Sequence, residues 1–114
     1  MDVSDDAVLL RIFLAEDDLH EHRLLYAAIV EKALEMKMAG ATVLPGPQGF
    51  GHSRRVRSEL NVESRPHGPV VVEIVDSEAR IERFLPVLDG MLESGLVTLE
   101  KVRARHYHPG PDEV

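Results

Sequence analysis

The chain has 114 residues, no cysteine and a formal net charge of −7, with 44% apolar and 29% charged residues. This length allows one domain with a single core, and the absence of cysteine excludes disulfides and thiolate metal sites. The sequence contains neither an apolar run long enough to span a membrane nor a signal-peptide pattern. We therefore expect a soluble, cytoplasmic protein without direct membrane insertion.

The charge is unevenly distributed along the chain. Residues 1–20 contain six acidic residues and one arginine, whereas residues 49–67 contain four arginines and two glutamates. An acidic chain with one locally basic segment lacks the broad basic face that nucleic-acid binding requires. We therefore expect no nucleic-acid partner, and the basic segment is either a solvated loop or a site for a small anionic ligand.

The first part of the chain predicts a strand followed by a helix. Residues 9–14 form a nearly continuous apolar run, which is typical of a strand buried on both faces. Residues 1–8 before this run are expected to be disordered. Apolar residues at three- and four-residue spacing then predict a helix over residues 21–38, with Gly40 placed to cap its C-terminus.

A short second strand is expected to lead into a long loop. Residues 41–44 are β-like, but Pro45 and Pro47 cannot donate hydrogen bonds to a ladder, so this strand belongs at an edge of the sheet. Residues 49–68 show little hydrophobic periodicity and are rich in glycine and arginine. Loops of this length inside a compact domain are usually functional or disordered.

The second part of the chain repeats the pattern of strand and helix. Residues 69–75 are the most apolar segment and predict a central strand. Asp76 and Ser77 then offer an N-cap for a helix that Pro86 should kink or break and that Gly95 should close. The apolar positions of this helix recur at three- and four-residue spacing: Ile81, Phe84, Leu85, Leu88 and Leu92.

The last strand is expected over residues 96–106. Its apolar and polar alternation slips at Glu100 and Lys101, which predicts a bulge at these two residues. Residues 108–114 should form a disordered tail.

The order of these elements indicates the fold. Two consecutive strand–helix–strand units within residues 9–107 predict an α+β, ferredoxin-like βαββαβ domain. Right-handed crossovers place both helices on one face of a four-stranded antiparallel sheet, with the first and third strands in the middle. The other face then has no helix over it, and an apolar face of this kind favours a homo-oligomer.

Five stretches of the sequence also resemble a known family. They are residues 24–33, 39–44, 49–51, 72–76 and 84–88, which read LLYAAIVEKA, AGATVL, GFG, VEIVD and FLPVL. In this order they look like the uncharacterised bacterial and archaeal family described as PII-like. The resemblance covers residues 9–107 and implies a ferredoxin-like subunit, a trimer, and a relation in shape to the nitrogen-regulatory PII signal proteins.

The resemblance also implies a loop with a function. In PII proteins a loop between the second and third strands contacts a partner protein, and adenine nucleotides bind between subunits. Residues 49–68 would be that loop here, and an adenine nucleotide would be the effector. PII proteins hold nucleotide phosphates with a glycine-rich, lysine-bearing turn after the second helix, whereas residues 90–95 contain Glu93 and no lysine. An anion site in this chain is then expected to be weaker or differently placed.

A candidate anion site lies where the second strand joins the basic loop. The two glycines of a Gly-Phe-Gly sequence permit positive φ and close backbone approach, so that amide groups could ring an anion while a nearby arginine supplies bidentate charge. The alternative is a simple turn anchored by its phenylalanine. The candidate ligand-binding residues are Gly49, Phe50, Gly51, Arg54 and Arg55.

The histidines do not predict a metal centre. His20 and His22 form one closely spaced pair, and His106 and His108 form another. Neither pair has a third ligand at a clear spacing, and the chain has no thiolate. Surface histidines are the better interpretation, and no metal is expected.

The acidic residues do not predict a catalytic centre either. Acid–base catalysis needs paired carboxylates, or a histidine and a carboxylate, in one pocket. Glu73 is the one acid within the most apolar strand, and we expect it to pair with Arg11 or Arg103 or to lie at a subunit interface. We therefore expect no catalytic residues.

Two classes of function remain open. The first is a non-catalytic regulatory or signalling protein that binds a small anionic ligand, such as an adenine nucleotide, between subunits and presents residues 49–68 to a partner protein. The second is a small enzyme, or a purely structural oligomer, on the same fold. No obligatory cofactor is expected in the first class.

Overall fold

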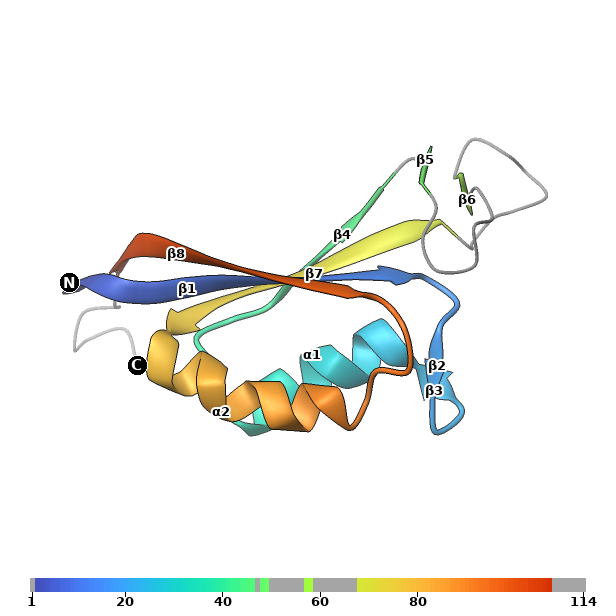
Figure 1. Ribbon diagram of the computed structural model, residues 1–114, viewed down its shortest axis with the longest axis horizontal. Helices are drawn as coiled ribbons and strands as arrows, with labels where there is room; N and C mark the ends of the chain where they lie inside the picture. The colour runs from blue at the N-terminus through green and yellow to red at the C-terminus, as the bar shows by residue number, and fades with distance from the viewer. Residues whose placement is uncertain (1, 47, 50–56, 59–67, 108–114) are drawn as a thin grey trace, which may run out of the picture.

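The computed structural model describes residues 2–46, 48–49, 57–58 and 68–107 of the chain. Its main elements are two helices and four long strands: α1 (Leu25–Glu35), α2 (Glu78–Asp89), β1 (Asp2–Ala15), β4 (Thr42–Pro45), β7 (Pro69–Ser77) and β8 (Leu96–His106). The four strands form one antiparallel sheet in the order β4-β7-β1-β8, and both helices lie on one face of it (Figure 1). The predicted α+β, ferredoxin-like βαββαβ fold is confirmed, with the first and third strands in the middle.

Two pairs of short strands lie outside this sheet. β2 (Leu19–His20) and β3 (Arg23–Leu24) form a hairpin between β1 and α1. β5 (Gln48–Gly49) and β6 (Arg57–Ser58) pair within the segment that connects β4 to β7.

The core lies between the sheet and the two helices. Leu10 and Ile12 of β1 are completely buried, and their partners Ile74 and Val72 across β7 are 1% and 0% exposed. Because side chains alternate along a strand, this register turns one set of apolar residues towards the helices and the other set towards the helix-free face. The helices supply the remaining large side chains of the core: Leu25, Ile29, Ile81, Phe84 and Leu88.

β1 begins at Asp2 instead of Leu9. Residues 2–8 are therefore part of the sheet and not the disordered segment expected from the sequence. Their backbone pairs with the last part of β8, where Asp2 lies opposite His106. This pairing depends on a strand nearly one hundred residues away, so local sequence did not indicate it. Met1 and residues 108–114 lie outside the described residues.

The bulge occurs in β1 and not in β8. The register is continuous at Glu100 and Lys101, which corrects the prediction of a bulge there, and it shifts between Ser4 and Ala7. The shift falls at Asp5 and Asp6, two consecutive acids that are both exposed. A regular strand would turn one of them towards the core, and the extra residue of a bulge avoids this.

α1 is shorter than the predicted helix over residues 21–38. Glu21 and His22 have φ values of 50° and 67° and form the two-residue turn of the β2–β3 hairpin, so the helix begins at Leu25. At its other end Lys37 has a φ of 58°, and the amide of Met38 donates to the carbonyl of Ala33 at 3.0 Å. This is a Schellman cap in which lysine takes the position expected for Gly40.

α2 begins as predicted and ends earlier. The hydroxyl of Ser77 accepts a hydrogen bond from the amide of Arg80 at 3.3 Å, which confirms the N-cap. The helix ends at Asp89, one turn beyond Pro86, and Gly95 lies outside it. Of the helices in the described part of the chain, none is long and apolar enough to cross a membrane.

The core makes a direct prediction about two leucines. Leu88 of α2 is 1% exposed, whereas Leu34 of α1 is 78% exposed. Leu88→Ala should reduce the free energy of unfolding by about 2–5 kcal/mol, because it removes buried methyl groups and leaves a cavity. The same substitution at Leu34 should change it by less than about 0.5 kcal/mol. Urea unfolding followed by circular dichroism measures both, and equal losses would contradict this description of the core.

Candidate functional site

The connection from β4 to β7 is closed at its base by two backbone hydrogen bonds. The amide of Gly46 donates to the carbonyl of Pro69 at 2.8 Å, and the amide of Glu16 donates to the carbonyl of Gly68 at 2.8 Å. A Cβ on Gly46 would lie 3.0 Å from Cγ of Pro69, so the two chain segments approach closely. The ends of three strands are thereby held together where the connection leaves the sheet.

The described part of this connection adds one strand pair beyond the closed base. Gln48 lies opposite Ser58 and Gly49 lies opposite Arg57. Of the five candidate ligand-binding residues, the structure places Gly49 in β5. The other four lie outside the described residues: Phe50, Gly51, Arg54 and Arg55. The loop over residues 49–68 and its anion site therefore stay predictions. The structure defines only the base of this loop, through the two backbone hydrogen bonds.

The turn between α2 and β8 lies at the same end of the sheet. Gly95 has a φ of 127°, and a Cβ there would lie 3.1 Å from the carbonyl oxygen of Phe13 and 3.2 Å from Cδ2 of Leu14. Leu14 pairs with Val70, next to the closed loop base. Glu93 in this turn is exposed. The acidic turn and the closed base of the connection therefore lie at the same end of the sheet, with the end of β1 between them.

Asp18 connects the loop base to the start of α1. Its carboxylate accepts a hydrogen bond from the amide of Ala15 at 2.9 Å, and its carbonyl accepts one from the amide of Leu25 at 2.8 Å. Ala15 is followed by Glu16, which bonds to Gly68. An aspartate in a turn can accept a hydrogen bond from a nearby backbone amide, so Asp18 after the apolar run of residues 9–14 is the sequence signal that could have indicated this role.

The paired histidines do not converge on a metal site. His20 lies in β2 and His22 in the following turn, and Nε2 of His20 is 3.5 Å from a carboxylate oxygen of Glu21. His106 ends β8, and His108 lies outside the described residues. Within the ranges that the structure describes, no group of three or more histidines and acids could hold a metal ion.

Glu73 pairs with Arg11 on the helix-free face of the sheet. Nε of Arg11 donates to the Glu73 carboxylate at 2.9 Å, and Nη1 donates to the Glu100 carboxylate at 3.4 Å. The hydrogen bond to Glu73 raises the pKa of the Arg11 guanidinium, which therefore stays charged over the whole working pH range. Arg103, the other predicted partner, pairs instead with Asp5 at 2.7 Å.

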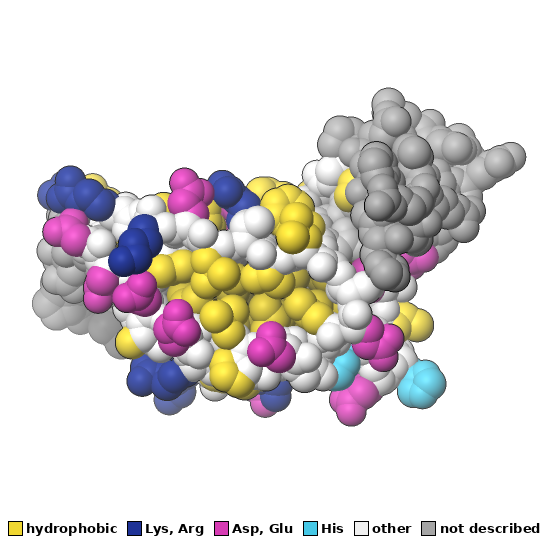
Figure 2. Space-filling view, viewed as in Figure 1, with side chains coloured by type: hydrophobic (Ala, Val, Ile, Leu, Met, Phe, Trp, Pro, Cys, Tyr) yellow, Lys and Arg dark blue, Asp and Glu magenta, His cyan; other side chains and the backbone are white. Residues whose placement is uncertain are grey.

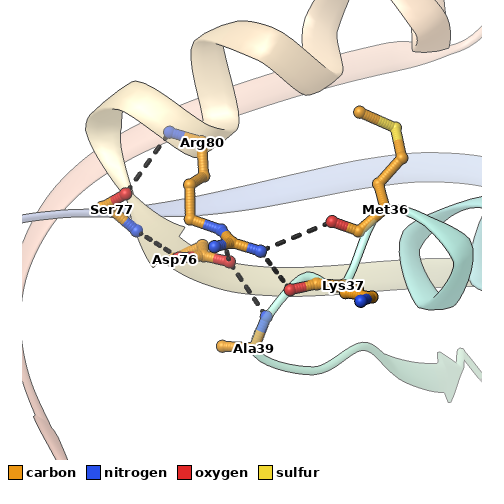
Figure 3. Close-up of polar contacts among 6 residues, drawn as sticks. All are labelled: Met36, Lys37, Ala39, Asp76, Ser77 and Arg80. Atoms are coloured by element: carbon orange, nitrogen blue, oxygen red, sulfur yellow. Dashed lines mark hydrogen bonds and ion pairs between the residues drawn. The ribbon is translucent and has the colours of Figure 1, made fainter.

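A second polar network lies where the C-terminus of α1 meets the N-terminus of α2, at the end of the sheet away from the closed loop base (Figure 3). The Asp76 carboxylate accepts hydrogen bonds from the amides of Ser77 at 2.7 Å and Ala39 at 2.9 Å, and it lies 3.2 Å from Nε of Arg80. The Arg80 guanidinium also donates to the carbonyl of Lys37 at the C-terminus of α1. These contacts join α1 to the start of α2 and compensate the free carbonyls of a helix end. We assign this network a structural role, because its contacts connect the two helix ends. Nε of Arg80 is buried without a hydrogen-bond partner among the described residues, but it faces the Asp76 carboxylate at 3.2 Å.

Hydrophobic side chains also gather along the border between β8 and α2 (Figure 2). Leu99 is 49% exposed and pairs with the buried Leu10, so it lies on the helix side of the sheet. This border is apolar surface on an edge strand, and it is separate from the loop base.

A family model described as "Uncharacterized ACR, COG1993", or DUF190, matches residues 7–104 of the chain. The chain belongs to the DUF190 family. The DUF190 match runs from the middle of β1 to near the end of β8, so it includes both helices, all of β4 and β7 and most of the two other strands of the sheet.

Curated relatives of this DUF190 chain carry names without an activity. The UPF0166 protein of Aquifex aeolicus (strain VF5) is 42% identical over 94 residues, covering 82% of this chain and 89% of the relative. The UPF0166 protein MJ1524 of Methanocaldococcus jannaschii is 34% identical over 95 residues, covering 82% and 86%.

Solved structures show that the DUF190 chain has a PII-like fold. It resembles CPII, a nitrogen regulatory PII-like protein from Thiomonas intermedia K12, in a structure bound to ADP, AMP and bicarbonate, with a TM-score of 0.56 and 15% identity over 86% of this chain and 87% of CPII. A structure of CPII bound to ADP and bicarbonate gives a TM-score of 0.53 and 17% identity, with the same coverage. The predicted membership of an uncharacterised PII-like family is confirmed.

The turn between α2 and β8 gives a test of the backbone conformation described for this DUF190 chain. Gly95→Ala should reduce the free energy of unfolding by about 1–3 kcal/mol, because its φ of 127° is unfavourable for alanine and the new Cβ would press on Phe13. Gly40→Ala is the matched control, since a Cβ there meets no atom within 4 Å. Chemical unfolding of both variants gives the comparison, and a loss at Gly40 as large as at Gly95 would show that the turn is not constrained in this way.

Proposed function

We propose that this protein is a non-catalytic, PII-like regulatory protein of the cytoplasm. In this proposal three copies associate, a small anionic ligand such as an adenine nucleotide binds between them, and residues 49–68 are presented to a partner protein. The observation that carries the proposal is that the closed loop base and the α2–β8 turn lie at the same end of the sheet, on a PII-like fold.

The closed base supports a loop with a role of its own. Gly46 bonds to Pro69 and Glu16 bonds to Gly68, so the two ends of this connection are held together where it leaves the sheet. A long connection between two strands of a compact domain is commonly a binding segment. Ligand or partner contacts made by such a segment can change without disturbing the sheet.

The helix-free face supports association of copies. Several large apolar side chains are exposed on this face or at its edges: Phe13, Leu44, Val75 and Leu96. An apolar face of a small sheet is an unfavourable surface in water, and covering it with further copies removes it from solvent. Association would also bring the loop base of one copy towards a neighbour, as a ligand site between subunits requires.

The CPII structures support the choice of ligand, because CPII was bound to adenine nucleotides and bicarbonate on a similar fold. The turn at residues 90–95 limits how far this argument extends. It carries Glu93 and no lysine, so a phosphate would lack a fixed cation in that turn. We assign the cationic contribution to Arg54 and Arg55, next to the Gly-Phe-Gly sequence.

Thermal unfolding in the presence of ligands tests the binding proposal. ATP, ADP, AMP and their cyclic forms are added separately, with and without bicarbonate. A nucleotide that binds the folded state should stabilise it by about 2.7 kcal/mol at one hundred times its Kd, which corresponds to a rise in Tm of about ten degrees. The double variant Arg54→Ala with Arg55→Ala should lose most of this rise.

Arg83→Ala is the matched control for the arginine variants, since Arg83 is an exposed arginine on α2, away from the loop. It should leave the ligand-dependent rise unchanged. No rise with any of these nucleotides would contradict the ligand proposal and favour the alternative of a purely structural oligomer.

The oligomer is tested independently by light scattering on the purified protein. We expect a single species of three times the 12.7 kDa chain mass at micromolar concentration. A monomer at this concentration would contradict a ligand site between subunits.

A further inference from the structure

A cluster of three charged side chains lies in the middle of the helix-free face. Arg11 on β1 is directly opposite Glu73 on β7, and it also reaches Glu100 on β8. The side chains of Arg11 and Glu73 are 39% and 28% exposed in the single chain, and that of Glu100 is 62% exposed. The cluster therefore joins all three neighbouring strands and is already partly removed from water.

Apolar residues enclose this cluster along both central strands. Side chains two positions apart on a strand lie on the same face, so the residues on either side of the cluster share its surface. On β1 and β7 these residues are Leu9, Phe13, Val71 and Val75. A partner that covers them must also cover the ion pairs between them.

We propose that this charged cluster lies inside the interface between copies of the chain and determines how the copies are aligned and how many associate. The inference rests on the proposed association through the helix-free face, and it adds the group that makes that association specific. A second copy of the chain covers this face, because it carries the charged groups that can pair with those of the first copy.

Each copy has a donor and an acceptor left over on this face. Arg11 uses Nε and Nη1, and its Nη2 has no hydrogen-bond partner within the described ranges. Glu100 meets Arg11 at only 3.4 Å and is largely exposed, so its carboxylate can accept further bonds. A second copy supplies both missing groups, whereas an uncharged apolar partner would leave both buried and unpaired.

The net charge of the cluster also selects the arrangement of the copies. One arginine and two glutamates carry a net negative charge, so two clusters placed directly against each other repel. An offset arrangement, in which Arg11 of one copy faces Glu100 of the next, pairs opposite charges. Such an offset makes a head-to-tail interface, which gives a closed ring when the rotation between successive copies closes, as the proposed trimer requires.

Removing one charge and removing all of them should have different consequences. A single reversal leaves unpaired like charges in a covered surface, which strongly opposes association. Replacing the whole cluster by apolar residues keeps the face attractive but removes the group that aligns it. A single polar or charged group in an apolar interface is known to fix register and number of chains in this way.

Two variants and one control test the inference. Glu100→Arg places a second guanidinium beside Arg11; the combined variant Arg11→Met, Glu73→Leu and Glu100→Leu makes the face wholly apolar. Glu82→Arg is the control, because Glu82 is an exposed acid on α2 and undergoes the same change of charge. Mass is measured by light scattering across a dilution series, and circular dichroism confirms that each variant unfolds cooperatively.

The inference is supported if Glu100→Arg raises the concentration at which the oligomer dissociates by at least about tenfold and the combined variant gives a mixture of masses. The control should retain the single mass of the unchanged protein. Unchanged mass and dissociation in both test variants would overturn the inference while leaving the proposed oligomer intact. If the unchanged protein is a monomer, both this inference and the proposed oligomer are wrong. If the unchanged protein is an oligomer of a single size that no nucleotide stabilises, the ligand proposal is wrong and this inference still holds.

Discussion

The structure depends on the register between β1 and β7, the two strands that have neighbours on both sides. This register places Leu10 and Ile12 opposite Ile74 and Val72 on the side of the helices. It necessarily turns the intervening residues to the other side, because a slip of one residue would exchange the two faces completely. The same register therefore determines both which residues form the core and which residues lie on the helix-free face. The same pairing also brings the ends of the strands together at the loop base.

The two ends of the subunit are consequently different in kind. At one end, Asp76 and Arg80 connect the C-terminus of α1 to the beginning of α2 with short polar contacts (Figure 3). At the other end, the hydrogen bonds from Gly46 to Pro69 and from Glu16 to Gly68 close the base of the connection between β4 and β7. The proposed ligand and partner contacts belong to this second end, away from the junction of the two helices. The helix-free face runs between the two ends.

The sequence predicted those elements whose residues carry their own signal. β7 and the N-cap at Ser77 follow from apolar runs and capping chemistry, and the fold follows from the order of elements. The first part of β1 was missed because its partner is the distant end of β8. Arg11 was foreseen as a partner of Glu73, but Glu100 was not, since that contact needs the alignment of a third strand. The hydrogen bond from Gly46 to Pro69 at the closed loop base was missed because it also depends on the alignment of distant strands. The role of Arg54 and Arg55 in an anion site stays a prediction.

The closed loop base also bears on how this family can diversify. The entropic cost of closing a loop grows only slowly with its length once its two ends are fixed near each other. Gly46 and Pro69 are fixed in this way by a 2.8 Å hydrogen bond and close packing. A segment of another length can therefore be closed between these two residues at little additional entropic cost. A single scaffold can in this manner acquire new binding specificities by exchanging one segment, and the same position is a natural place to insert a reporter peptide.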